Sequence, residues 1–293
     1  MRRHLFALIA AGLLWGSTVP LTKVALAGWG PGWLTVARFT LAALPLAWLA
    51  RHRLRAAVTP AIIGWGVLGY GLVIVLQNAG IERTSVTHAA LLVGATPILV
   101  ALLTVATGRA TVRPTAWAGF ATALAGVAFV ASHGGSGATL TGDALVILSL
   151  VLSAAFLVAQ PRMLTGRDPV AVTAVQLTAA AVGAVPAAAL LDGPAPAAPG
   201  AIPLLAMLGL AVGGTLLPFT LFAYAQSRVS PDVAGAFLNL EPLVGVLAAA
   251  AVFGEALGVA QVAGGVAILA GIALSTAAAF LRPARPRRLE LAG

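Results

Sequence analysis

Residues Pro231 to Glu255 read PDVAGAFLNLEPLVGVLAAAAVFGE, an apolar stretch long enough to cross a bilayer as a helix. It carries a carboxylate, Glu241, near its middle, and Pro242 follows directly. A carboxylate at that depth in lipid is costly, so it indicates either a functional site or a buried partner. The stretch therefore predicts a membrane helix with one special residue.

The composition of the whole chain also indicates a membrane protein. Only 9% of the 293 residues are charged, and the mean hydropathy is +1.01. Soluble domains have about a quarter charged residues, so the chain is predicted to be a polytopic membrane protein in contact with the lipid bilayer. The absence of cysteine excludes disulfides and thiolate metal sites. The net charge of +9 comes from short loops and tails, and we do not expect it to bind nucleic acid.

The fold class expected is all-α, with ten transmembrane helices arranged as two inverted five-helix repeats. Helix is the expected state because a membrane span must satisfy its own backbone hydrogen bonds, and no strand-like alternation is found. The predicted spans are residues 5–27, 31–50, 60–81, 84–107, 114–132, 142–163, 169–191, 202–226, 231–253 and 256–280.

Arginine placement predicts the orientation in the membrane. If the N-terminus is inside, the inner loops and tails hold nearly all of the arginines outside the spans, and the outer loops hold Arg83 alone. This asymmetry favours an even number of spans with both termini cytoplasmic, in the cell (inner) membrane. The apolar start after Met1 is interpreted as a retained first helix because no cleavage pattern stands out.

An internal repeat underlies the five-plus-five division. Sliding the chain by 145 residues aligns Pro97 with Pro242, Gly119 with Gly264 and Gly126 with Gly271, and a shift of 138 places Arg38 over Gln176. Because five is odd, the second copy must enter the membrane in the opposite direction, as in many secondary transporters. The expected units are residues 1–138 (first repeat), 139–281 (second repeat) and 282–293 (basic cytoplasmic tail).

Several short strings carry a resemblance to a known family. They are Leu14-Trp15-Gly16-Ser17 leading to Lys23, Ala37-Arg38-Phe39, Ala95-Thr96-Pro97, Leu240-Glu241-Pro242 and Phe253-Gly254-Glu255. In this order on ten spans, the chain resembles EamA-type transporters of the drug/metabolite transporter (DMT) superfamily over its whole length. The resemblance implies a two-repeat carrier of small metabolites, often amino acids or related compounds, frequently moved outward. The second copy departs from the pattern, with Gln160-Pro161 in place of the Trp-Gly pair.

Glu241 and Arg38 are the main charged candidates. Glu241 is ten residues into its span, roughly 15 Å deep, where it would bind a cationic group, take up a proton, or pair with Arg38. Arg38 cannot be discharged, so it needs a carboxylate, carbonyls or water, from a substrate or from the bundle. Lys23, near the outer end of span 1, is expected to snorkel to the surface.

Polar and aromatic residues in the spans complete the candidate pathway. Trp15 and Ser17 lie in mid-span 1, where Gly16 and Pro20 are expected to bend the helix, as Pro97 and Pro242 do in spans 4 and 9. Each has ordinary packing or an interhelical hydrogen bond as its alternative; a lone histidine such as His88 is more often an interface residue than a proton relay. The remaining pathway candidates are Tyr70, Gln77, Asn78, His88, Thr96, Gln160, Tyr224 and Asn239.

The sequence favours a secondary carrier of a small-molecule substrate over two other classes. Enzyme signatures such as His-Glu-x-x-His, Gly-x-Ser-x-Gly or a phosphate loop are absent from it, and no cofactor or metal is expected. A non-transporting scaffold or receptor is the alternative, which the short loops disfavour. The small residues Gly264, Gly265 and Gly271 suggest close helix packing, either within the chain or in a homodimer.

Overall fold

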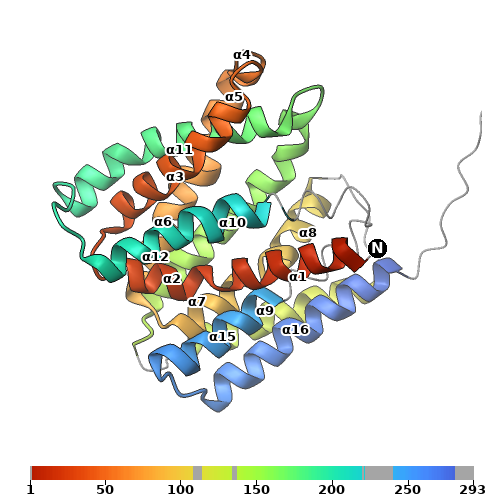
Figure 1. The fold of residues 1–293 in the computed structure, drawn as a ribbon. Helices are drawn as coiled ribbons and strands as arrows, with labels where there is room; N and C mark the ends of the chain where they lie inside the picture. The colour runs from red at the N-terminus through yellow and green to blue at the C-terminus, as the bar shows by residue number, and fades with distance from the viewer. Residues whose placement is uncertain (1, 108–113, 134–136, 220, 222–239, 281–293) are drawn as a thin grey trace, which may run out of the picture.

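The computed structural model describes residues 2–107, 114–133, 137–219, 221 and 240–280, and every regular element in these ranges is helical (Figure 1). In the first half they are α1 (Arg2–Gly16), α2 (Thr18–Ala25), α3 (Pro31–Leu49), α4 (Leu54–Ala57), α5 (Pro60–Gly66), the π-helix η1 (Val67–Leu72), α6 (Val73–Arg83), α7 (Val86–Val93), α8 (Thr96–Ala106) and α9 (Pro114–Ser132). In the second half they are α10 (Leu140–Leu164), α11 (Pro169–Asp192), α12 (Ala201–Ala211), the π-helix η2 (Val212–Leu216), α15 (Leu240–Phe253) and α16 (Val259–Phe280).

Seven helical stretches within the described residues are long and apolar enough to cross a membrane. They are residues 6–25, 31–49, 60–83, 86–106, 140–160, 169–192 and 201–219, and three shorter apolar helices cover 117–132, 240–253 and 259–274. The protein is therefore an all-helical, multi-pass membrane protein. The end of predicted span 8 and the start of span 9 lie outside the described residues.

Two of the spans are interrupted beside the residues expected to bend them. Span 1 divides at Ser17, between Gly16 and Pro20, into α1 and α2. Span 4 divides at Gly94 and Ala95 into α7 and α8, with Pro97 in the first turn of α8. Pro242 lies in the first turn of α15, and the chain before it is outside the described residues.

Two π-helical segments lie in the middle of other spans. η1 begins at Val67 and η2 begins at Val212, so their first residues are 145 positions apart, which is the shift that aligns the two halves of the sequence. A π-helical turn leaves backbone groups out of the usual hydrogen-bond ladder and is frequent at functional sites. It also changes the rotation per residue, so Tyr70 in η1 and Gln77 in α6 are not related by α-helical spacing over the whole interval between them.

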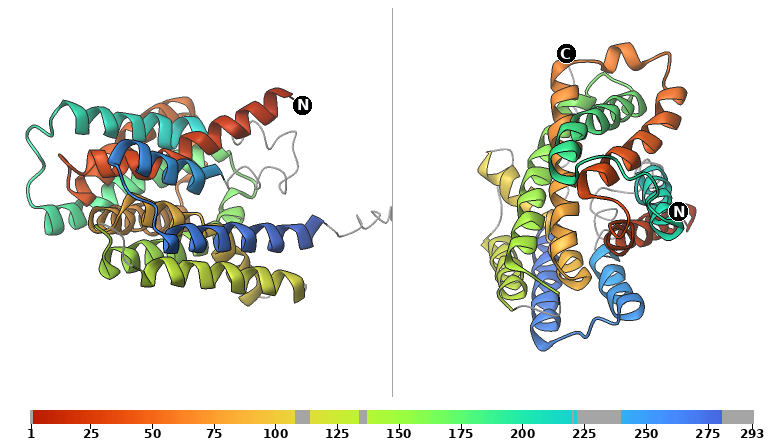
Figure 2. Two further views of the ribbon diagram at one scale, coloured as in Figure 1. Left: turned by 90° about the horizontal axis from the view of Figure 1, so that it is seen from below. Right: turned by 90° about the vertical axis from the view of Figure 1, so that its left-hand side faces the viewer.

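Helices pair closely where glycines face one another. α9 and α16 lie side by side along one edge of the molecule (Figure 2). A Cβ at Gly126 would lie 2.7 Å from the Gly264 oxygen, and one at Gly271 would lie 2.5 Å from the Gly119 oxygen. The predicted small-residue contact is therefore made within the chain.

α15 packs between α1 and α7, and glycines again allow the helices to approach closely. A Cβ at Gly16 would lie 2.5 Å from Cβ of Val244 and 3.0 Å from the Glu241 oxygen, while one at Gly245 would lie 2.4 Å from Cβ of Ala90. These close approaches bring the backbone of Glu241 against the interruption in span 1. Glu241 therefore lies beside the boundary between α1 and α2.

Candidate functional site

A chain of aromatic rings runs through the middle of the bundle. Trp15 on α1 meets Phe219 edge to face at 5.4 Å between ring centroids, and Phe219 lies 6.5 Å from Tyr70 on η1. Tyr70 in turn contacts Phe156 on α10 at 4.8 Å and Phe39 on α3 at 5.9 Å. We call Trp15, Arg38, Tyr70, Phe156 and Phe219 the central cluster. It collects residues from both halves of the chain.

Arg38 is the buried cation of this cluster. Its Nε donates to the Thr215 hydroxyl at 2.9 Å, and its Nη2 donates to the Gly214 carbonyl at 3.2 Å. Both acceptors belong to η2, so the π-helical segment supplies the groups that a buried guanidinium requires. Of the two alternatives for Arg38, the structure shows pairing within the bundle, and its remaining N–H donors are not used by these bonds.

Glu241 is the acidic residue next to the cluster. It lies in the first turn of α15, half-buried, with its backbone against Gly16. Among the described residues, neither a hydrogen bond nor an ion pair reaches its carboxylate, and the Arg38–Glu241 pair considered from the sequence is not formed. Along span 1, the Glu241 backbone oxygen lies beside Gly16, and the Arg38 guanidinium lies near Thr18, since both approach Gly214.

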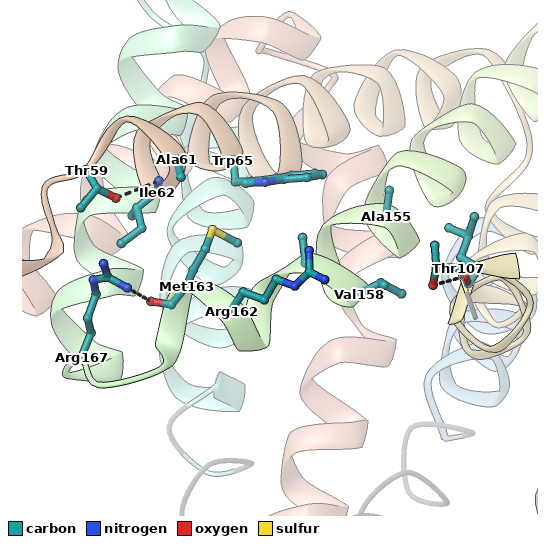
Figure 3. A pocket seen from close by; sticks show the side chains of 12 residues that line it. Thr59, Ala61, Ile62, Trp65, Thr107, Ala155, Val158, Arg162, Met163 and Arg167 are labelled. Carbon is teal, nitrogen blue, oxygen red and sulfur yellow. Dashed lines mark hydrogen bonds between the residues drawn. The ribbon is translucent and has the colours of Figure 1, made fainter. Parts of the chain in front are cut away.

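A cleft opens at the end of the bundle that carries Arg162 (Figure 3), and neither Arg38 nor Glu241 lines it. Its volume is about 500 Å³, and it lies between α5, α8 and α10. Apolar side chains line most of it, together with two guanidinium groups. The lining comprises Thr59, Ala61, Ile62, Trp65, Leu103, Thr107, Ala155, Val158, Ala159, Arg162, Met163 and Arg167.

The opposite end, which carries Glu255, is fastened at the turn between α6 and α7. Lys23 donates to the carbonyls of Ile81, Glu82 and Thr84 at 2.7–3.0 Å, where the last carbonyls of α6 need partners. The Glu255 carboxylate accepts from the backbone N–H groups of Val86 and Thr87, at 2.8 and 2.9 Å, where α7 begins. The snorkelling expected for Lys23 stays a prediction; the structure shows its ammonium group bound to a helix end, with the residue half-buried.

A buried hydrogen-bond network lies at the same end. His88 Nδ1 is 2.9 Å from Asp143 Oδ2, and the second carboxylate oxygen accepts from the Thr84 hydroxyl. Gln261 on α16 contacts His88 Nε2 at 3.1 Å, and all four side chains are buried. His88 thus ties α7 to α10 and α16, and it does not join the central cluster.

The other candidates are distributed over the bundle. Asn78 donates to Pro31 and Thr35, so it fastens α6 to α3, and Gln77 lies one residue away on the same helix. The side chains of Ser17 and Thr96 bond to carbonyls three residues earlier, and Gln160 exchanges hydrogen bonds with Gln176 at 2.9 and 3.1 Å. Tyr224 and Asn239 lie outside the described residues.

The sequence argument missed several partners because their residue types are common in membrane helices. Phe156, Phe219 and Thr215 carry no motif that sets them apart. Asp143 could have been found, because it and His88 are two titratable residues predicted at the same membrane face. The role of Glu255 as a helix cap depends on a contact between distant segments, which sequence spacing does not provide.

These features define a class of protein. A multi-pass helical membrane protein with interrupted helices, two π-helical segments and a buried arginine has features that are frequent in membrane transport proteins. Comparison with known proteins is consistent with this class. An "Uncharacterized inner membrane transporter YedA" from Escherichia coli (strain K12) is 28% identical over 96% of this chain and 92% of its own. A "Probable terminal-alkyne amino-acid exporter" from Streptantibioticus cattleyicolor is 28% identical over 94% and 93%.

The family follows from a match over nearly the whole sequence. The EamA-like transporter family matches residues 2–132 and again residues 140–277, so the chain belongs to that family. One solved crystal structure matches 96% of this chain and 99% of its own, with a TM-score of 0.68 and 19% identity, which shows a shared fold. The resemblance read from the sequence is confirmed.

Proposed function

We propose that the protein is a secondary carrier of small organic metabolites, amino acids or related compounds, that works by alternating access and favours export. The observation that carries the proposal is the pair Arg38 and Glu241, both near the boundary between α1 and α2 and beside a row of aromatic rings. A substrate with a carboxylate, an amine and an apolar body finds a complementary group for each part there. The relative named as an amino-acid exporter supports this substrate class.

The proposal includes ten transmembrane helices in two inverted repeats, 1–138 and 139–281. Two observations support it: η1 and η2 begin 145 positions apart, and the two glycine pairs related by the same shift, Gly119/Gly264 and Gly126/Gly271, lie in the contact between α9 and α16. Gly126 meets Gly264 while Gly119 meets Gly271, so each repeat-related pair contacts the other reciprocally, as at a two-fold axis. Reciprocal contacts of this kind are expected of inverted repeats.

The proposed orientation has both termini in the cytoplasm of a cell whose inner membrane holds the protein. The excess of arginine in loops and tails on one side supports it. The Arg162 end is then the inner end, and the Glu255 end is the outer end. A homodimer remains a prediction without a surface assigned to it, because the glycine face of α16 is used against α9.

Counterflow in proteoliposomes tests the proposed transport directly. Vesicles holding the purified protein and loaded with a panel of unlabelled amino acids are diluted into trace radiolabelled ones, and uptake is compared with that of empty vesicles. We expect at least one amino acid with an apolar side chain to accumulate transiently. If neither the amino acids nor a wider panel of organic acids and amines exceeds empty vesicles, the carrier proposal fails.

Glu241→Gln tests whether the carboxylate takes part in transport. The substitution keeps the side-chain shape and removes the charge, so we expect counterflow to fall at least tenfold, or its dependence on pH to flatten. Thr96→Val, at the repeat-related position in span 4, is the matched control, because Thr96 satisfies its hydroxyl within its own helix. Equal flux and an equal pH profile for Glu241→Gln and wild type would remove the carboxylate from the mechanism.

A further inference from the structure

The cleft at the Arg162 end holds a cation with no neutralising partner in the part of the chain that the structure describes. Arg162 is exposed, and among the described residues nothing hydrogen-bonds or ion-pairs with its guanidinium group. Figure 3 shows this group extending from α10 into the space between Trp65 and Val158. None of the lining residues is acidic, so the cleft is electropositive.

Arg167, the second arginine of the cleft, is held in place. Its Nη1 donates to the Met163 carbonyl and its Nε donates to the Ala56 carbonyl, both at 3.3 Å. Neither acceptor carries a charge, so these bonds fix the side chain without cancelling its positive charge. Two guanidinium groups therefore act on one cavity, and Arg162 is the one free to move toward a ligand.

The rest of the lining suits an apolar body attached to the anion. Ile62, Trp65, Leu103, Val158 and Met163 supply hydrophobic walls, and a volume of about 500 Å³ is within the range of small-molecule sites. Guanidinium groups bind carboxylates with two parallel hydrogen bonds, so the chemistry of the cleft fits an amphipathic carboxylate.

The cleft is also connected to the central cluster. Trp65, on its wall, lies 6.1 Å from Phe156, and Phe156 lies 4.8 Å from Tyr70, from which the rings continue through Phe219 to Trp15. An unbroken row of rings thus leads from the mouth at the Arg162 end to the break in span 1. A site for bulk lipid would not need this connection.

We propose that the cleft is the cytoplasmic entry subsite for the carrier's substrate, in which Arg162 captures the carboxylate of an amphipathic metabolite before it passes along the rings. This inference rests on the proposed transport function and adds a second binding position, in a cleft that Glu241 does not line. Capture at the mouth raises the local substrate concentration, because an electropositive cleft with low-dielectric walls attracts anions.

The natural absence of cysteine allows a test that does not depend on transport. Ala159→Cys places one thiol on the cleft wall, three residues before Arg162 and therefore on the same face of α10. The thiol is labelled with a negatively charged (sulfonate) or a positively charged (trimethylammonium) methanethiosulfonate reagent at low ionic strength. We expect the negative reagent to be favoured, and we expect Arg162→Gln to lower the ratio of the two rates about five- to tenfold.

Two matched variants make the result specific to the charge of Arg162. Arg162→Lys keeps the charge and should keep the ratio. Arg55→Gln removes an exposed arginine of α4 that does not line the cleft, and it should leave the ratio unchanged. A ratio that does not respond to Arg162→Gln, or responds equally to Arg55→Gln, overturns the proposed role of Arg162.

Ligand protection then identifies the occupant. 3-Phenylpropionate should slow labelling of Ala159→Cys several-fold, whereas its amide, which lacks the charge, should not, and Arg162→Gln should abolish the difference. Nanodiscs of phosphatidylcholine with or without phosphatidylglycerol provide the other arm. Protection by phosphatidylglycerol with none by the carboxylate would make the cleft a lipid site and overturn the proposal.

The two proposals fail separately. Absence of counterflow with an intact charge preference at Ala159→Cys would refute the carrier but leave the anion site. Counterflow that is normal in Arg162→Gln, together with an unchanged labelling ratio, would refute the entry subsite and leave the carrier.

Discussion

The two ends of the bundle differ in how tightly positions related by the repeat are packed. At the Glu255 end, α2 packs against α12, and a Cβ at Gly209 would lie 3.6 Å from Leu21. At the Arg162 end, the position 145 residues earlier is Gly64 on α5, and a Cβ there would meet no atom within 4 Å. These two related positions thus differ in packing: the one on α12 meets a neighbouring side chain, and the one on α5 does not.

The difference in packing is matched by a difference in hydrogen bonding. Lys23 and Glu255 bind the two helix ends that meet at the α6–α7 turn, and Asp143 binds Thr84 within that turn. Across the Arg162 end, the ion pair among the described residues is Arg53 with Asp168, with the arginine side chain 71% exposed. A cleft of about 500 Å³ also lies at the Glu255 end, lined in part by Glu82, Arg83 and Asp192, so the two ends differ in these hydrogen bonds and not in cleft volume. If the proposed carrier and its orientation hold, the contacts of Lys23, Asp143 and Glu255 are the ones that break when the outer side opens.

Removing Asp143 should have the largest effect on this contrast. Asp143→Ala leaves the Thr84 hydroxyl and the buried His88 ring without their acceptor, which costs about 2–5 kcal/mol in the free energy of unfolding. Unfolding by sodium dodecyl sulfate in mixed micelles measures it. Asp143→Asn, which keeps an acceptor for Thr84, should lose less. Equal stability of Asp143→Ala and wild type would contradict the importance of the network.

Removing the Lys23 ammonium group should cause the second-largest loss of stability. Lys23→Met keeps the length of the side chain but leaves three carbonyls at the end of α6 without a charged donor, for an expected loss of about 1.5–3 kcal/mol. Unfolding by sodium dodecyl sulfate in mixed micelles also measures this loss in the free energy of unfolding. Lys23→Arg, which keeps the charge, should recover part of the loss. If Lys23→Met costs nothing, the ammonium group is not holding the Glu255 end closed.

A pair of glycine substitutions compares the packing of the two ends directly. A Cβ at Gly80 on α6 would lie 2.7 Å from Val146 Cγ2 and 2.8 Å from the Gly142 oxygen on α10, so Gly80→Ala should cost about 1–3 kcal/mol. Gly64→Ala meets open space in a helix, so it should be neutral or stabilise by up to about 1 kcal/mol. Similar losses at both positions, measured by thermal unfolding in detergent, would remove the contrast.

The sequence predicted what depends on lipid and on local pattern. The helical class follows from hydropathy. Bends at Gly16, Pro20 and Pro97 stay predictions, although the boundaries between α1 and α2 and between α7 and α8 lie beside these residues. The repeat also led to the right glycines, since the four that it aligns, Gly119 with Gly264 and Gly126 with Gly271, are the ones that face each other between α9 and α16. These features depend on local sequence or on the internal repeat, and both can be recognised from the sequence.

The sequence could not supply contacts between side chains of distant spans. Glu255 caps α7 across more than half of the chain, and Lys23 reaches the end of α6, because the fold brings those ends together. Arg38 donates to Thr215 in η2 and does not pair with Glu241. Hydrophobic periodicity in the sequence does not show where a π-helical segment forms, so the sequence does not predict this contact. The division into ten spans and the roles of the candidate pathway residues stay predictions.

The smallest effect is expected at the Arg162 end, for the Arg53–Asp168 pair. Asp168 lies outside the membrane spans, and the Ala171 N–H, followed by the Arg53 guanidinium, holds the pKa of its carboxyl below its usual value. A depressed pKa stabilises the folded state above the unfolded pKa, near 4, and this contribution is lost as pH falls through the folded value.

Because the arginine side chain is largely in solvent, Arg53→Gln should cost only about 0.5 kcal/mol at pH 7 and less in 0.5 M salt. A double-mutant cycle with Asp168→Asn, followed by thermal unfolding at pH 7 and pH 4, isolates the pair. A coupling as large as the loss from Lys23→Met would mean that the Arg162 end is fastened as firmly as the Glu255 end, and the contrast between the two ends would then be wrong.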